Sequence, residues 1–156
     1  MYGLISLEEQ AVLNCQKLLS KIVQMKFKLD YIPILEKEWL NQKRYCVITY
    51  FLENSKVSFC VIFRKQKFHS FGTIHKGKSE DGETINIDDY DKVKNKVELL
   101  VYCYPFNNEI KFISIESLEI YKAKGEIFKH ENKADRKIEW VFSCDLTRNI
   151  GEWING

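Results

Sequence analysis

Apolar residues near the start of the chain recur with the period of an α-helix. The face that they form consists of Ala11, Cys15, Leu18 and Ile22. Ser6 and Glu9 have the spacing of a capping box, in which each side chain accepts a hydrogen bond from the backbone amide of the other residue. This pattern predicts a helix over residues 7–28 whose apolar face packs on the rest of the fold.

A proline then indicates a second, short helix over residues 33–41. Pro33 suits the first turn of a helix, where its missing N–H group needs no partner. Leu35 and Trp39 follow at a spacing of four residues, which places them on one face of such a helix.

Beyond residue 44 the chain is rich in valine, isoleucine, tyrosine and phenylalanine, in short runs that polar turns separate. Such runs are typical of β-strands. Strands are predicted at residues 44–52, 56–65, 67–75, 97–104, 109–114, 126–130 and 137–143. Glu53-Asn54-Ser55 is the turn of a first hairpin, and residues 76–83 form a polar loop with two glycines.

Short helices separate the later strands. Asp88 or Asp89 caps one of them over residues 89–96, and Ser114 caps the other over residues 115–122. The resulting order is α-α-β-β-β-α-β-β-α-β-β. It predicts an α+β fold in which the N-terminal helix packs on a mostly antiparallel sheet.

The chain length of 156 residues is typical of one domain. We therefore expect a single domain over residues 1–156, with its core at about 6–143 and a loose C-terminal tail at 144–156. Trp153, in that tail, is expected to be available for a contact with a partner.

The cysteine pattern predicts reduced, structural thiols. There are five cysteines, and no two have the spacing of a metal-binding pair. These residues therefore predict neither a metal site nor a cofactor. No apolar run approaches the ~20 residues needed to span a bilayer, so we expect no membrane association and a cytoplasmic protein.

The net charge of +2 hides two segments of opposite sign. The basic segment, residues 64–79, has five lysines or arginines and no acid, and the acidic segment, residues 80–91, has six acids and no base. Lysines with aromatic neighbours suit phosphate contacts and base stacking. The candidate nucleic-acid-binding residues are Arg64, Lys65, Lys67, His69, Phe71, Lys76 and Lys78. The alternative is a solvated edge strand whose lysines prevent aggregation.

The order of elements over roughly residues 6–120 resembles the αβββαβ core of the PD-(D/E)XK, or restriction-endonuclease-like, superfamily. Residues 91–105 resemble the passage from helix to strand in that core, and residues 108–115 resemble the strand that follows. The resemblance implies a nuclease-like architecture and, for an active nuclease, a bound Mg²⁺ ion.

That family's active site needs an aspartate on one hairpin strand and Glu-x-Lys on the next, and this hairpin departs from the pattern. Residues 44–52 contain no acid, and Phe63 stands two positions before Lys65. The nearby candidates for catalysis are Glu9, Glu53 and Lys65, although Glu9 also suits a helix cap and Glu53 a solvated turn. The sequence thus predicts a degenerate nuclease site, with Mg²⁺ bound only if the protein is a nuclease.

Two functions remain open. The first is a nucleic-acid-associated protein of PD-(D/E)XK-like architecture, with DNA or RNA as partner. The alternative is a small protein-interaction module, such as an inhibitor or immunity-type protein, that contacts its partner through the acidic segment. Retention on heparin or on an anion exchanger would discriminate between them.

Overall fold

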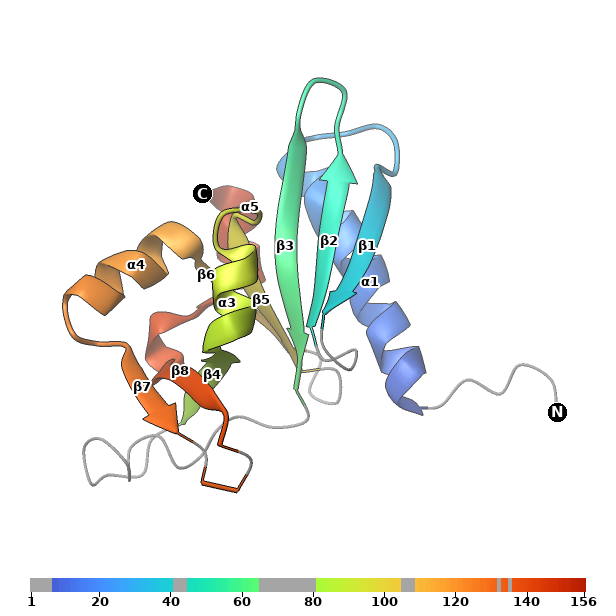
Figure 1. The fold of residues 1–156 in the computed structure, drawn as a ribbon. Coiled ribbons are helices and arrows are strands. Elements are labelled where there is room, and N and C mark those ends of the chain that lie inside the picture. Colours follow the sequence, from blue (N-terminus) through green and yellow to red (C-terminus); the bar gives the residue numbers. More distant parts are fainter. Residues whose placement is uncertain (1–6, 41–44, 65–80, 105–108, 132, 135) are drawn as a thin grey trace, which may run out of the picture.

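The fold contains two sheets of different size (Figure 1). The computed structural model describes residues 7–40, 45–64, 81–104, 109–131, 133–134 and 136–156. The six-stranded sheet has the order β1 (Ile34–Leu40), β2 (Tyr45–Phe51), β3 (Lys56–Phe63), β5 (Leu99–Tyr104), β6 (Glu109–Ser114) and β9 (Arg148–Asn149). The three-stranded sheet has the order β4 (Gly82–Asn86), β8 (Ile138–Ser143) and β7 (Phe128–Glu131). The predicted α+β class is confirmed.

Strand pairing in the six-stranded sheet is mostly antiparallel, as predicted. β1, β2 and β3 form an antiparallel meander, and β5 pairs with β6 in the same way. β3 and β5 are parallel. A parallel pair needs a crossover connection, and here the connection includes β4 and the helix α3 (Ile87–Val93).

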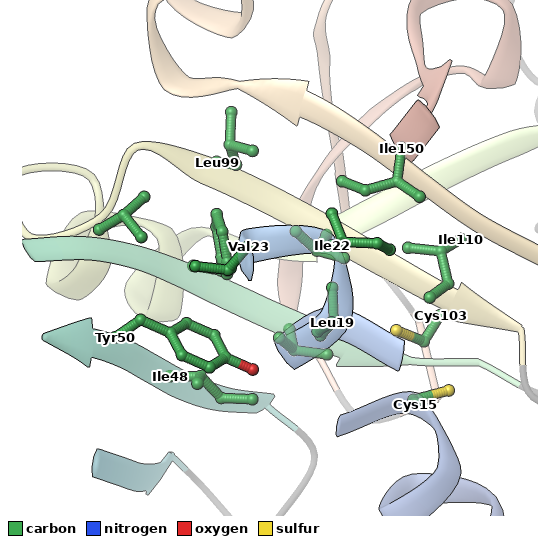
Figure 2. Packing of buried hydrophobic residues seen from close by; sticks show 14 of the residues in the cluster. Cys15, Leu19, Ile22, Val23, Ile48, Tyr50, Leu99, Cys103, Ile110 and Ile150 are labelled. Atoms are coloured by element: carbon green, nitrogen blue, oxygen red, sulfur yellow. The ribbon is translucent and has the colours of Figure 1, made fainter. Parts of the chain in front are cut away.

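Helix α1 (Leu7–Lys26) covers one face of the six-stranded sheet, as Figure 2 shows. Its buried hydrophobic residues are Cys15, Leu19, Ile22 and Val23. The predicted core position of Leu18 is wrong, because its side chain is 42% exposed whereas Leu19 is fully buried. Successive residues on a helix point about 100° apart, and at that spacing Leu18 falls outside the arc that Cys15, Leu19, Ile22 and Val23 span. The side chain of Ala11 lies outside the described part of the helix.

A second core lies on the other face of the six-stranded sheet. There α3, α4 (Ile115–Ala123) and the three-stranded sheet bury a layer rich in aromatic side chains. Its largest fully buried members are Tyr90, Tyr102, Tyr104 and Phe142. The six-stranded sheet is therefore the middle layer, and residues on alternate positions of β2, β3 and β5 serve the two cores.

The helix predicted over residues 33–41 is instead β1. All seven residues of β1 pair with β2, from Ile34 opposite Phe51 to Leu40 opposite Tyr45. A spacing of four residues, as between Leu35 and Trp39, places two side chains on one face in a strand as well as in a helix. The pairing with β2 therefore decides between two structures that the local pattern allows equally.

Several other boundaries follow the predictions closely. The hairpin of β2 and β3, the strands β5 and β6, and the hairpin of β7 and β8 are confirmed. The Ser114 side chain caps α4 by accepting a hydrogen bond from the Ser117 amide at 3.0 Å, as predicted. The predicted strand over residues 67–75 and most of the predicted loop over 76–83 lie outside the described residues.

The region around α3 differs from its prediction in two ways. β4 begins at Gly82, where the sequence indicated a loop. The cap of α3 is Asn86, whose side chain accepts from the Asp89 amide at 3.1 Å, and is neither Asp88 nor Asp89. The helix consequently begins two residues earlier than predicted. Asparagine is as good a cap as aspartate, and the pairing of β4 with β8 determines which residue occupies that position.

The C-terminal tail is packed, which corrects the prediction of a loose end. Helix α5 (Ile150–Asn155) lies beside α1, and the Trp153 ring contacts Phe27 and Phe59 at centroid distances of 6.0 and 5.3 Å. The ammonium group of Lys26 donates to the backbone oxygens of Trp153 and Gly156, at 2.7 and 2.6 Å. Trp153 is thus partly buried against the core, and is not a free contact residue.

The five cysteines, which all lie within the described residues, are thiols that form no disulfide. Four are buried, and Cys15 of α1 forms a thiol hydrogen bond with Cys103 of β5. Burial raises the pKa of Cys60 to about 12 and that of Cys46 to about 11. These thiols are therefore protonated and unreactive at neutral pH. Among the described helices, none is both long and apolar enough to cross a bilayer.

Candidate functional site at the carboxyl ends of the central strands

Three strands of the six-stranded sheet end at the same edge. β1 and β3 are each antiparallel to β2, and β5 is parallel to β3, so all three run in one direction. Their last residues are Leu40, Phe63 and Tyr104. In open α/β sheets, ligands bind beyond the carboxyl ends of such strands. We call this place the carboxyl edge.

On the α1 face of this edge, two aromatic rings lie together. The rings of Trp39 in β1 and Phe63 in β3 have centroids 6.0 Å apart and planes inclined by 33°. Trp39 is 38% exposed, and Phe63 is half-buried. Lys37 lies on the same face of β1, and its ammonium group donates to Gln16 of α1 at 3.1 Å. We call Trp39 and Phe63 the aromatic pair.

On the opposite face of the edge, an ion pair joins the two sheets. The guanidinium of Arg64, directly after β3, donates through Nε to Oε1 of Glu83 in β4 at 3.1 Å. Its Nη2 donates to the backbone oxygen and the hydroxyl of Thr84, at 2.8 and 3.0 Å. Tyr104 donates to Oε2 of Glu83, and Tyr102 donates to the Thr84 backbone oxygen at 3.1 Å. We call these five residues the Arg64–Glu83 cluster.

The charges in this cluster satisfy one another. The Glu83 side chain is 1% exposed, and burial raises its pKa, although the Arg64 guanidinium and the Tyr104 hydroxyl oppose that rise. Burial also raises the pKa of Tyr102 and Tyr104, so both hydroxyls remain hydrogen-bond donors. Both carboxylate oxygens of Glu83 are engaged. The cluster is therefore suited to hold β4 against the six-stranded sheet, and not to transfer protons to a ligand.

Of the candidate nucleic-acid-binding residues, the structure describes Arg64. Its side chain lies between the two sheets in the Arg64–Glu83 cluster, and 23% of it is exposed. The other six lie outside the described residues: Lys65, Lys67, His69, Phe71, Lys76 and Lys78. A contact of this segment with nucleic acid stays a prediction.

The catalytic candidates do not come together. Glu9 is an exposed residue near the start of α1, and Glu53 is exposed in the turn between β2 and β3. That turn lies at the opposite end of β3 from Phe63, roughly 23 Å away at ~3.3 Å per residue. Glu53 therefore cannot share a metal ion with groups at the carboxyl edge. Lys65 lies outside the described residues.

Oxygen ligands for a magnesium ion are not gathered at the hairpin. β2 and β3 contain no aspartate or glutamate. Within the described ranges, no group of three histidine, cysteine, aspartate or glutamate side chains could hold a metal ion. Mg²⁺ prefers carboxylate oxygens, so the residues of this hairpin do not fit it.

The acidic segment is divided between interior and surface. Glu83 and Asp89 are buried, whereas Asp81, Asp88 and Asp91 are exposed. Asp91 lies 3.4 Å from the ammonium group of Lys94, one turn further along. The surface that this segment offers to a partner is therefore less acidic than the sequence suggests.

Sequence reasoning missed both features of the carboxyl edge. The sequence pattern predicts a helix for the segment that contains Trp39. It therefore gives no reason to expect a contact between Trp39 and Phe63 within one sheet. The Arg64–Glu83 pair had a signal, namely the adjacent basic and acidic segments, whose charges can neutralise one another. Nothing in the local sequence shows which two of those charges meet.

The sequence matches no family model and no curated protein. Among solved structures, the architecture is similar to that of a nuclease from a fusselovirus, with a TM-score of 0.57 and 14% sequence identity. The match covers 99% of this chain and 94% of that chain. At this identity the likeness shows the fold, which is nuclease-like.

Proposed function

We propose that this protein binds nucleic acid through a nuclease-like fold of the PD-(D/E)XK type, and that its hairpin does not cleave with Mg²⁺. The observation that carries the proposal is the likeness to the viral nuclease over 99% of the chain. Substrate and activity do not transfer at 14% identity. The proposal therefore also depends on the topology and charge of this chain.

The topology supports the proposal. The elements in and around the six-stranded sheet have the order of the αβββαβ core. Helix α1 is followed by the meander β1–β3, the crossover helix α3 and the parallel strand β5. β4 is an addition to that order, and the Arg64–Glu83 cluster holds it in place. The basic segment follows β3 directly in the sequence, so it starts from the carboxyl edge.

We expect no Mg²⁺-dependent cleavage of plain duplex DNA. In the family pattern, paired acids hold the metal that activates water. Here β2 and β3 offer Cys46, Val61 and Phe63 near the carboxyl edge, and none of these side chains is an oxygen ligand for Mg²⁺. The measurement is a gel assay of duplex DNA with Mg²⁺ and with a chelator. Robust cleavage that disappears in Glu53→Ala or Lys65→Ala would contradict this prediction and restore a nuclease.

Binding to nucleic acid should weaken steeply with salt. Each phosphate contact contributes about −0.9 to the log–log slope on duplex and about −0.7 on single strands. Replacing Lys67 and Lys76 together by alanine should flatten that slope by up to roughly two units. The measurement is a salt titration of binding for wild type and variant.

The matched control removes the same charge elsewhere. Lys92 and Lys96 are exposed residues of α3 and of the turn that follows it. Their joint replacement by alanine should leave the slope unchanged if the basic segment makes the contacts. If both double variants flatten the log–log salt slope equally, binding depends on the overall charge of the protein and not on the basic segment.

The second candidate function remains the protein-interaction module. The observation that favours it is the exposure of Asp81, Asp88 and Asp91. Such a module would be retained on an anion exchanger and would not bind to heparin. No measurable affinity for single- or double-stranded DNA or RNA at low salt would remove the nucleic-acid proposal and place this one first.

A further inference from the structure

We propose that the aromatic pair, Trp39 and Phe63, is a platform on which a base of single-stranded nucleic acid stacks. The inference rests on the proposed function and adds to it the kind of nucleic acid and the place of contact. It depends on described residues alone. It assigns a binding role to the carboxyl edge, whose hairpin residues do not fit a metal ion.

The geometry of the pair leaves an aromatic surface open. Trp39 stands near the end of β1, which is the edge strand of the six-stranded sheet. It lies opposite Cys46 of β2, and its ring reaches past that small residue to Phe63 of β3. Phe63 supports the indole from one side, and 38% of Trp39 remains exposed. A supported and partly exposed indole can serve as a surface on which a base stacks.

The charges around the platform suit a phosphate backbone. Lys37 is exposed on the same face, two residues from Trp39, which is roughly 7 Å along the strand. Its contact with Gln16 places it beside α1. Between Gln10 and Leu29 the helix and its extension carry four lysines and no acid, and of these Lys17, Lys21 and Lys28 are exposed. Glu9, which is also exposed, stands just before this stretch. The acids of β1, Glu36 and Glu38, alternate with Lys37 and Trp39 along the strand, so they lie on the opposite face of the sheet.

A single strand fits this surface better than a duplex does. The flat faces of duplex bases are already covered by their neighbours, whereas an unpaired base can leave the stack and lie on an aromatic side chain. Stacking of this kind is tolerant of sequence, because every base has an aromatic face. The platform should therefore prefer single-stranded DNA or RNA without a strong preference among bases.

A second copy of the chain does not suit this edge. Antiparallel pairing of β1 with itself around Lys37 would bring Lys37 against Lys37, and Glu36 against Glu38 of the other copy. Like charges directly opposite one another destabilise a sheet, and charged residues on edge strands commonly prevent such pairing. Charge therefore favours a polyanion over self-association at this strand.

The experiment measures binding of an unstructured oligothymidylate of roughly 16 nucleotides, and of a duplex, by fluorescence anisotropy at low salt. Trp39→Ala should weaken binding to the single strand by about 5-fold to 150-fold and leave binding to the duplex unchanged. Trp39→Phe should restore most of the affinity because it keeps a ring. Ile34→Ala is the matched control, since Ile34 is 76% exposed at the other end of the same strand. It should bind like wild type.

Other outcomes separate this inference from the proposed function. If wild type binds and Trp39→Ala binds equally well, the platform is wrong and the nucleic-acid proposal stands. If Trp39→Ala and Trp39→Phe both lose affinity for duplex and single strand alike, Trp39 has a general role and the platform is again wrong. If wild type binds neither probe, both proposals fail. A thermal melt of each variant confirms that the compared proteins are folded.

Discussion

Replacing Arg64 with methionine should lower the free energy of unfolding by about 3–5 kcal/mol, which is typical for breaking a buried ion pair. The reason is the carboxylate left behind. Glu83 is 1% exposed, and its charge would lose the guanidinium that lies 3.1 Å away. Two hydrogen bonds to Thr84 would be lost as well. Chemical denaturation of wild type and variant measures the change.

The pH dependence of the variant tests the cause. Burial already raises the pKa of Glu83, and loss of Arg64 would raise it further. Between the unfolded and the folded pKa of this carboxyl, the folded state binds more protons than the unfolded state, so stability falls as pH rises. The penalty should therefore be smallest near pH ~4 and grow by at most about 1.4 kcal/mol per pH unit above it. A penalty independent of pH would contradict an electrostatic origin.

Two further variants complete this test. Lys94→Ala removes a half-buried lysine from its pair with the exposed Asp91, and should cost no more than about 1 kcal/mol. The double variant Arg64→Met with Glu83→Gln should recover part of the loss, because the remaining partner is then neutral. A double variant as unstable as the sum of its single changes would show that Arg64 and Glu83 are not coupled.

Leu19→Ala should destabilise the fold by about 2–5 kcal/mol, whereas Leu18→Ala should change it by less than about 0.5 kcal/mol. The two leucines are adjacent on α1 and lose the same atoms. Leu19 is fully buried in the core between α1 and the six-stranded sheet (Figure 2). Leu18 is 42% exposed. Comparison of the two denaturation midpoints is the measurement. Equal effects would show that the helix is rotated from the orientation described.

The sequence by itself determined the elements whose signals are local. The helical period predicted α1, and the Ser114 cap predicted α4. Short turns between apolar runs predicted the β2–β3 and β7–β8 hairpins. These signals act between residues a few positions apart, so no knowledge of the rest of the chain was needed. The α+β class followed from the order of these elements.

For the candidate site, the sequence determined less. It showed that the hairpin lacks paired acids, since that absence depends on residue types alone. It showed two charged segments but not that Arg64 and Glu83 are buried together. That contact depends on β4 joining β8, a strand more than fifty positions later in the chain.

Tertiary structure decided the remaining features. The segment from Pro33 to Leu40 suits a helix or a strand, and pairing with β2 makes it a strand. The tail packs against the core because Lys26 and the sheet offer partners to Trp153. The aromatic pair exists because a residue of β1 meets one of β3 across β2. Each of these outcomes depends on contacts between residues distant in the chain, and such contacts leave no periodic signal in the sequence.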